Sequence, residues 1–222
     1  SYSYMLDSIC SSQERNDILY QWKNDARLLE RNKFIGDLYN DFITHHDGIH
    51  LMKTMMANYI LEGIYFYSGF MFFYNLGRMG KMPGSVQEIR YINRDENTHL
   101  WLFRSMILEL QKEEPQLFTP ALVEEYKDML RYGVEEEIRW GSYVIGNDIE
   151  GLTMQMVREY IYYLGNLRST SLGFGTLYEG YEKEPASMEW VSMYANANLI
   201  KTDFFEARSS AYAKSSALVD DL

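Results

Sequence analysis

An almost continuous apolar stretch, residues 59–76, limits most strongly what this chain can fold into. It reads YILEGIYFYSGFMFFYNL and approaches the length of a membrane-spanning helix. One carboxylate, that of Glu62, lies inside it, and a charged group in a lipid-facing span costs about 2.5–3.5 kcal/mol. No second stretch of this kind occurs in the sequence. We therefore expect a helix that other helices bury on all sides, and no membrane-embedded part.

Helical spacing of apolar residues extends over most of the chain, and no segment alternates convincingly as a strand would. Turn-forming residues are scarce, with 15 Gly and 4 Pro among 222 residues, so long uninterrupted elements are expected. Ser85, with Glu88 three residues later, is predicted to cap one long helix, and Thr119 to cap another. The predicted helical segments lie within 1–30 and at 34–42, 49–77, 85–112, after 119 and at 153–172.

These segments predict an all-α bundle over residues 1–180, followed by an irregular C-terminal tail over residues 181–222. Ser and Ala are frequent toward the end of that tail. Within the bundle, Met52, Met55 and Met56 are expected to fill the core, because flexible thioether side chains adapt to irregular gaps.

Charge and cysteine content exclude some classes of function. A formal net charge of −11 argues against nucleic acid or an anionic membrane as partner. The acidic run Glu135–Glu137 is expected on a solvated helix face. The single Cys10 cannot form an internal disulfide, which favours a reducing compartment, the cytoplasm. The chain starts with Ser and shows no charged-then-apolar leader, so we expect that something was removed or never belonged to it.

The first candidate for chemistry is the pair Glu96 and His99. Residues three apart project from one face of a helix, so a carboxylate and an imidazole would lie side by side. Di-iron bundle proteins bind metal with this Glu-x-x-His element. By itself the element is a weak signal, because the same spacing is common on surface helices.

Glu62 strengthens that signal. It stands alone among apolar residues on a helix that is predicted to be buried, and a buried carboxylate needs a cation, a partner or a proton. It is either a neutral or salt-bridged core residue, or a bridging metal ligand. The helix that carries Glu62 and the helix that carries Glu96 and His99 follow each other in the chain, as in the metal-binding bundles.

The ligand count is only half of what a dinuclear site needs. Such a site takes an acid from each of two helices and Glu-x-x-His from each of two others. This chain offers one acid and one Glu-x-x-His. Asp47 and His50 have the same spacing, but they lie in a polar break beside a Gly, where His45 and His46 are also expected to be exposed.

Four segments of the sequence are distinctive when taken together: LEGIYFYSGF (61–70), RYINRDENTHL (90–100), EYIYYLGNLR (159–168) and DFFEARSSAY (203–212). In this order they resemble the second half of the small, radical-generating subunit of class I ribonucleotide reductase. The resemblance implies a ferritin-like helical bundle with a dinuclear metal centre, iron or else manganese. It also implies that Glu62, Glu96 and His99 are metal ligands.

By the same resemblance, Tyr2 in the segment SYSY (1–4) matches the radical-bearing tyrosine, and Tyr4 is the nearest other candidate. Phe66, Phe70 and Ile92 resemble the family's apolar pocket, which keeps water and reductants away from the radical. The alternative for these three is ordinary core packing, which is compatible with the first role.

Further roles are implied for three polar residues. Asp95 resembles the family's carboxylate that orients a metal-bound His, and its alternative is a surface ion pair with Arg94. Tyr212, with Glu206 six residues earlier, resembles the family's radical-relay tyrosine and its upstream Glu. The tail is expected to dock on the large subunit, and its alternative is a disordered solubilising segment.

The resemblance implies a function that needs partners. An oxygen-activated dinuclear centre would generate a tyrosyl radical, which the large subunit uses to reduce ribonucleotides to deoxyribonucleotides. We expect a dimeric small subunit, the large catalytic subunit, and a companion polypeptide with the missing acid, the first Glu-x-x-His and an early Trp. Two alternatives are another ferritin-like dinuclear-metal oxidase or hydroxylase, and a non-catalytic metal-storage homodimer that pairs two half-sites.

Overall fold

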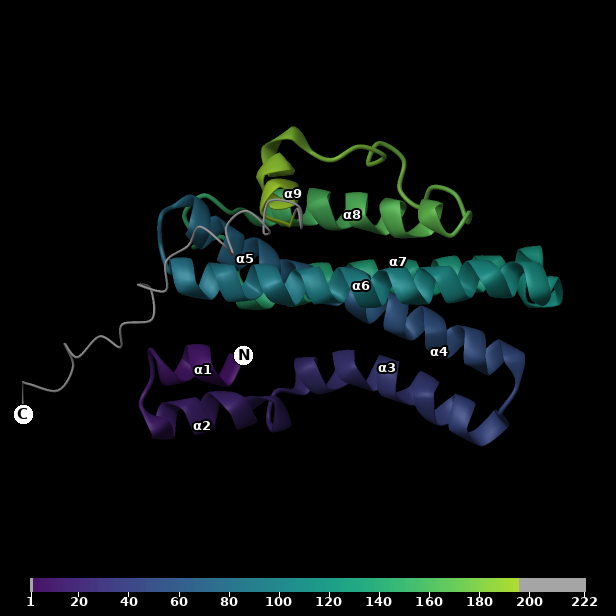
Figure 1. Ribbon diagram of the computed structural model, residues 1–222, viewed down its shortest axis with the longest axis horizontal. Coiled ribbons are helices and arrows are strands. Elements are labelled where there is room, and N and C mark those ends of the chain that lie inside the picture. Colours follow the sequence, from purple (N-terminus) through teal and green to yellow (C-terminus); the bar gives the residue numbers. More distant parts are fainter. Residues whose placement is uncertain (1, 196–222) are drawn as a thin grey trace, which may run out of the picture.

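The computed structural model describes residues 2–195 as helices joined by turns, with no strand among them (Figure 1). The side chains of Tyr2 and Met5 are outside this description. The short elements are α1 (Tyr2–Asp7), α2 (Ser12–Tyr20), α9 (Glu189–Ala195) and the 3-10 turns η1 (Gln21–Lys23), η3 (Pro115–Phe118) and η4 (Ala186–Met188). The elements that build the bundle are α3 (Ala26–His45), α4 (Gly48–Ile60), the π-helix η2 (Leu61–Tyr65), α5 (Tyr67–Arg78), α6 (Pro83–Glu113), α7 (Pro120–Val144) and α8 (Met154–Ser171).

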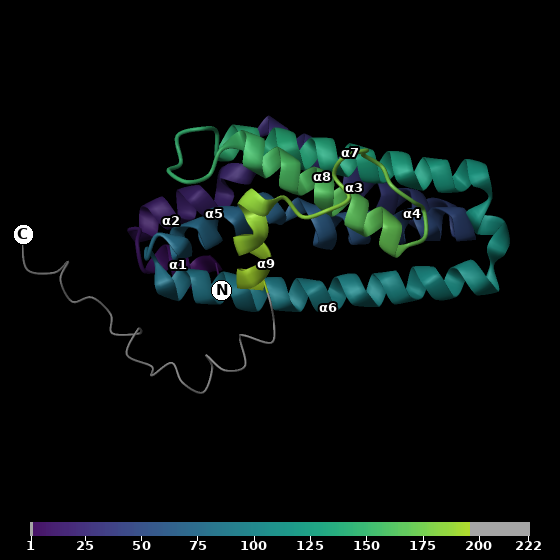
Figure 2. The ribbon, with the colours of Figure 1, turned by 90° about the horizontal axis from the view of Figure 1, so that it is seen from above.

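The segment from α4 through η2 to α5 forms the centre of the bundle. It contacts both long helices, α6 on one side and α7 on the other (Figure 2). α3 packs along α4, and α8 packs along α7. This central position explains why the apolar stretch of the sequence is buried, with Tyr59, Ile60, Ile64, Phe70 and Tyr74 at most 1% exposed. No helix among residues 2–195 is long and apolar enough to cross a membrane.

The predicted methionine core is confirmed, because Met52, Met55 and Met56 are all buried. The acidic run was predicted wrongly in one of its three residues. Glu135 is exposed and Glu136 is half-buried, but Glu137 is completely buried. Its place on α7 explains the difference, since it lies on the same helix face as buried Val134 and Ile138.

Helix starts follow local chemistry, with one exception to the prediction. The Thr119 side chain accepts a hydrogen bond from the backbone N–H of Leu122 at 3.4 Å, as its capping role requires. The predicted Ser85 cap is wrong, because α6 already begins at Pro83. Proline suits a first helical position, where no backbone N–H is needed, and the left-handed Met82 (φ 48°) turns the chain into the helix.

Two departures from the predicted helix pattern matter for function. The long helix predicted over 49–77 is interrupted by the π-turn η2. The predicted irregular tail contains η4 and α9, whose residues Met188 and Val191 are fully buried in the core. The proposed division at residue 180 stays a prediction, and residues 196–222 lie outside the described part of the chain.

Candidate metal centre

Glu62, Glu96 and His99 meet at one place. Glu62 projects from the π-turn η2, and the other two project from α6, where the i, i+3 spacing puts them on one face. One potential ligand atom from each of the three lies within 4.8 Å of the others. His99 Nδ1 is 2.8 Å from Glu96 Oε2 and 3.8 Å from Glu62 Oε1. The structure therefore brings together the three residues that the sequence singled out.

The burial of the cluster is uneven. The Glu62 side chain is 14% exposed and that of His99 is 53% exposed, so the cluster is open on the imidazole side. Glu62 Oε2 is buried and has no hydrogen-bond partner. Burying a carboxylate oxygen without a partner costs free energy, and a cation at this position would satisfy it.

The electrostatics of the cluster favour a bound positive charge. Burial, assisted by the neighbouring Glu96 carboxylate, raises the pKa of Glu62 to about 7. The hydrogen bond to Glu96 raises the pKa of His99 above its usual range. Near neutral pH the group thus retains protons, and a metal ion would take their place.

Aromatic residues follow Glu62 along the central segment from η2 into α5. Phe70 is 1% exposed, and its ring centroid lies 6.1 Å from that of Phe66. Phe66 lies where η2 passes into α5, and Tyr67 meets the Phe70 ring edge-on at 5.4 Å. Ile92, one turn before Glu96 on α6, is half-buried and packs against the same core. All three predicted pocket residues thus belong to the apolar core or its margin.

The comparisons with known proteins decide the family. The family model described as ribonucleotide reductase, small chain, matches residues 1–185. This chain belongs to the ribonucleotide reductase small-chain family. It is 71% identical over 222 residues to the ribonucleoside-diphosphate reductase subunit beta of Treponema pallidum, covering 100% of this chain and 63% of that protein. The corresponding subunit of Halalkalibacterium halodurans is 39% identical over 217 residues, which are 98% of this chain and 62% of the relative.

Solved structures of the family share the fold. The ribonucleotide reductase R2 subunit from Clostridium botulinum superposes with a TM-score of 0.83 at 47% identity, over 88% of this chain and 61% of that one. The predicted ferritin-like, all-α bundle is therefore confirmed. The chain spans less than two thirds of the length of these relatives. The expected companion polypeptide finds no support in these comparisons, which match single polypeptides.

Other residues that the family resemblance singled out lie apart from the cluster or outside the description. Asp95 is exposed and accepts hydrogen bonds from Arg94 at 2.9 and 3.1 Å, the ion pair that was its alternative. The Tyr2 side chain, Glu206 and Tyr212 lie outside the described part. The roles that the resemblance implies for Asp95, Tyr2, Glu206 and Tyr212 therefore stay predictions.

The remaining histidines do not join the centre. His45 and His46 are exposed, and His50 contacts Asp47 at 2.8 Å and stacks on His45 with ring centroids 4.1 Å apart. They lie around the turn between α3 and α4, as expected for a polar break.

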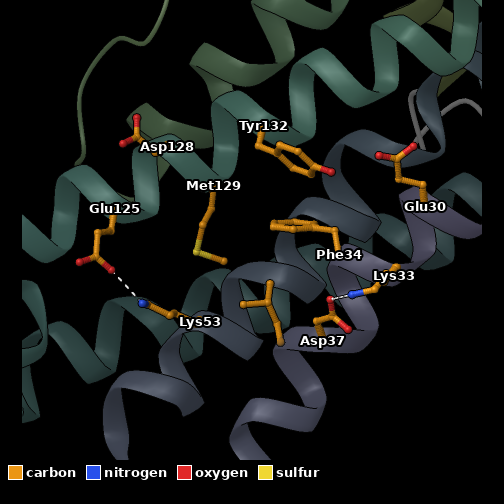
Figure 3. A pocket seen from close by; sticks show the side chains of 10 residues that line it. Glu30, Lys33, Phe34, Asp37, Lys53, Glu125, Asp128, Met129 and Tyr132 are labelled. Atoms are coloured by element: carbon orange, nitrogen blue, oxygen red, sulfur yellow. Dashed lines mark hydrogen bonds and ion pairs between the residues drawn. The ribbon is translucent and has the colours of Figure 1, made fainter. Parts of the chain in front are cut away.

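An open groove lies on another part of the bundle, away from the cluster of Glu62, Glu96 and His99. It encloses about 600 Å³ between α3, α4 and α7, and no residue of the metal cluster lines it (Figure 3). Phe34 and Tyr132 both line it, and their rings contact each other at an angle of 44° with centroids 4.4 Å apart. Two ion pairs lie in its lining, Lys33 with Asp37 and Lys53 with Glu125. Glu30 and Asp128 also line it, and Asp128 pairs with Arg131 outside the groove.

Sequence reasoning did not single out three charged residues that contact the segment carrying Glu62. They are Arg31, Glu137 and Arg168. For Glu137 a signal was present, since it falls at helical spacing between apolar Leu130, Val134 and Gly141. No comparable pattern marks the two arginines, whose partners are backbone oxygens of a distant segment.

Proposed function

We propose that this chain serves in the small subunit of a ribonucleoside-diphosphate reductase, where it helps to generate the radical for deoxyribonucleotide synthesis. The observation that carries the proposal is the cluster of Glu62, Glu96 and His99 with its unpartnered buried carboxylate oxygen. It occurs in a chain that is 71% identical to a protein named for this activity.

The cluster suits the metal that the family implies. Two carboxylates and an imidazole are donors that Fe and Mn both accept, and we take iron as the first choice and manganese as the second. Glu62, Glu96 and His99 would hold the ions from the side of η2 and α6. When bound, a dinuclear centre would supply the oxidation by oxygen that forms a tyrosyl radical.

The chain's own residues then have the following proposed roles. Tyr2 carries the radical, and Phe66, Phe70 and Ile92 exclude water from it. Asp95 would orient a metal-bound imidazole other than that of His99, in place of the ion pair that it forms with Arg94 in the structure.

The path of the radical leads to a partner. Tyr212, with Glu206, relays the radical toward the large catalytic subunit, where ribonucleotides are reduced. Because η4 and α9 pack on the bundle, the docking part of the predicted tail 181–222 is proposed to lie within residues 196–222. The small subunit is a dimer that works in the cytoplasm.

The metal part of the proposal is tested with His99→Ala and Glu62→Ala. Each removes a donor, so the dissociation constant for Mn(II), followed by electron paramagnetic resonance of the free ion, should rise at least about tenfold. His50→Ala is the matched control, because His50 also contacts a carboxylate near a helix start but lies outside the cluster. Unchanged metal binding in both cluster variants would overturn the assignment.

The radical part is tested with Tyr2→Phe. The variant should bind metal like the wild type and lose the radical signal that appears after aerobic loading with Fe(II) in the presence of reductant. Tyr4→Phe serves as control, since Tyr4 is 79% exposed and two residues away. A radical signal that persists in Tyr2→Phe and disappears in Tyr4→Phe would move the radical to Tyr4. A metal-loaded protein with no radical in any variant would favour an oxidase or storage function.

A further inference from the structure

The backbone around Glu62 finds hydrogen-bond partners outside its own helix. The Gly63 carbonyl accepts a hydrogen bond from Arg168 Nε at 3.0 Å, and the Tyr65 carbonyl accepts one from Arg31 Nη2 at 2.5 Å. The Ser68 backbone N–H donates to Glu137 Oε1 at 2.7 Å. A π-turn breaks the regular α-helical pairing, so these groups need partners, and buried backbone groups rarely go without one.

The three partners are charged, buried and supplied by three different helices. Arg31 comes from α3, Glu137 from α7 and Arg168 from α8. Arg31 and Glu137 also form an ion pair with each other, and their side chains are 5% and 0% exposed. The Arg31 guanidinium lies 3.8 Å from the centre of the Tyr65 ring, and Arg168 Nη2 donates to the Tyr67 hydroxyl at 3.0 Å.

Stability alone does not account for this arrangement. A regular α-helix satisfies its own interior backbone groups and needs no such side chains. Buried ion pairs contribute little net stability, because desolvation of both charges offsets their attraction. What the arrangement does determine is where the helix changes from α to π. Each residue turns an α-helix by about 100°, so a one-residue change of register would rotate Glu62 away from α6.

We propose that Arg31, Glu137 and Arg168 are positioning residues that hold the π-turn and so direct Glu62 toward Glu96 and His99. The proposal rests on the proposed metal centre, because it concerns the placement of one of its ligands. None of the three touches the ligand atoms, and they act through the backbone of residues 63–68.

Gly63 also contributes to the packing around the π-turn. A Cβ atom at this position would lie 2.8 Å from Leu100 Cδ1 and 2.9 Å from Arg168 Nε. Leu100 follows His99 on α6, so the absence of a side chain lets the ligand helix and the arginine both approach the turn. Gly69, on the exposed side of α5, has no atom within 4 Å of such a Cβ and is a matched control.

The test compares Arg168→Met and Glu137→Gln with Glu136→Gln in the full chain. Glu136 neighbours Glu137 on α7, but its carboxylate pairs with the exposed Arg139 instead of the π-turn. Amide hydrogen exchange of peptides covering 61–70 is measured without metal. Co(II) affinity is measured by its visible absorption, and helix content by circular dichroism.

We expect at least tenfold faster exchange in the 61–70 peptides and at least tenfold weaker Co(II) binding in the two network variants, at unchanged helix content. Glu136→Gln should stay within twofold of wild type. Arg168→Lys, which keeps a donor for the Gly63 carbonyl, should recover most of the affinity. Gly63→Ala should give both faster exchange and weaker Co(II) binding without removing a charge. It therefore keeps the proposal testable if Glu137→Gln fails to fold. Gly69→Ala should change neither the exchange nor the Co(II) affinity.

Unchanged exchange in folded Arg168→Met and Gly63→Ala would overturn the proposal. Faster exchange with Co(II) affinity within twofold of wild type would overturn it as well, because the network would then hold the backbone without placing Glu62. A wild-type chain that binds no Co(II) would count against the proposed metal centre. Even then, the exchange rates measured without metal would show whether Arg31, Glu137 and Arg168 stabilise the π-turn.

Discussion

Glu62 is a largely buried carboxylate with an unsatisfied oxygen, which suits a ligand and is costly without one. Its Oε2 atom is buried without a hydrogen-bond partner, and burial raises its pKa to about 7. In the absence of a cation, the folded chain must either keep a proton on this carboxylate or accept an uncompensated charge. A residue retained under such a penalty is typical of a functional site.

The penalty predicts that Glu62→Gln stabilises the metal-free chain at alkaline pH. The folded-state pKa is raised, so the stabilising contribution of the protonated carboxyl is complete below the unfolded value near 4.5 and is lost as the pH rises through about 7. Gln keeps a neutral side chain at every pH. After discounting for solvent screening, we expect a gain of about 1 kcal/mol at pH 8, or roughly 2–4 °C in melting temperature.

Thermal unfolding in EDTA at pH 4.5 and pH 8 checks this prediction. The gain should vanish at the lower pH, and Glu109→Gln, at an exposed position of α6, should change little at either pH. An equal gain at both values would mean that ionisation of Glu62 has no part in it.

Within single elements, local rules explain most of the helix boundaries. Thr119, Thr153 and Asp47 each accept a hydrogen bond from a backbone N–H three residues ahead, and such caps are readable in a sequence. The π-turn η2 was not readable, because almost every residue around it is apolar and no period can be distinguished there. The continuous apolar composition of residues 59–76 therefore predicted a buried helix but could not predict the π-turn within it.

Gly69 provides the test at this scale. It lies on the exposed side of α5 with open space where a Cβ would be, so it contributes only backbone freedom. Gly69→Ala should raise the free energy of unfolding by about 0.5–1 kcal/mol, measured by urea denaturation. Gly63→Ala, in contact with Leu100 and Arg168, should lower it. Destabilisation by Gly69→Ala would show that α5 is not a regular exposed helix at this position.

On the scale of the molecule, sequence reasoning succeeded where contacts are local and failed where they are distant. Glu96 and His99 share one helix turn, and Glu62 stood out as a lone charge, so the cluster was predictable. The contact of Arg31 with Glu137 joins positions 106 residues apart and depends on how α3 and α7 pack. The packing of η4 and α9 onto the bundle was likewise not predictable, because this segment follows a Gly-rich and polar stretch.

The segment formed by η4 and α9 predicts a contrast between two methionines. Met188 is fully buried against the bundle, whereas Met193 is 64% exposed on α9. Met188→Ala should lower the free energy of unfolding by about 2–5 kcal/mol through the lost burial and the cavity it leaves. Met193→Ala should stay within about 0.5 kcal/mol of wild type in the same urea titration. Equal effects would mean that residues 186–195 do not share in the core.

The long reach of the contacts around the π-turn has a consequence for the order of assembly. Gly63 and Arg168 are separated by 105 positions, and contacts of such separation form only when the intervening helices have packed. Glu96 and His99 adjoin as soon as α6 exists, whereas Glu62 reaches them only in the finished bundle. If the proposed centre holds metal, a chain still emerging from the ribosome would present two of the three donors of this cluster, and an ion bound early would be held weakly and exchange freely. Discrimination among metals would then begin at the end of folding, when Glu62 joins Glu96 and His99.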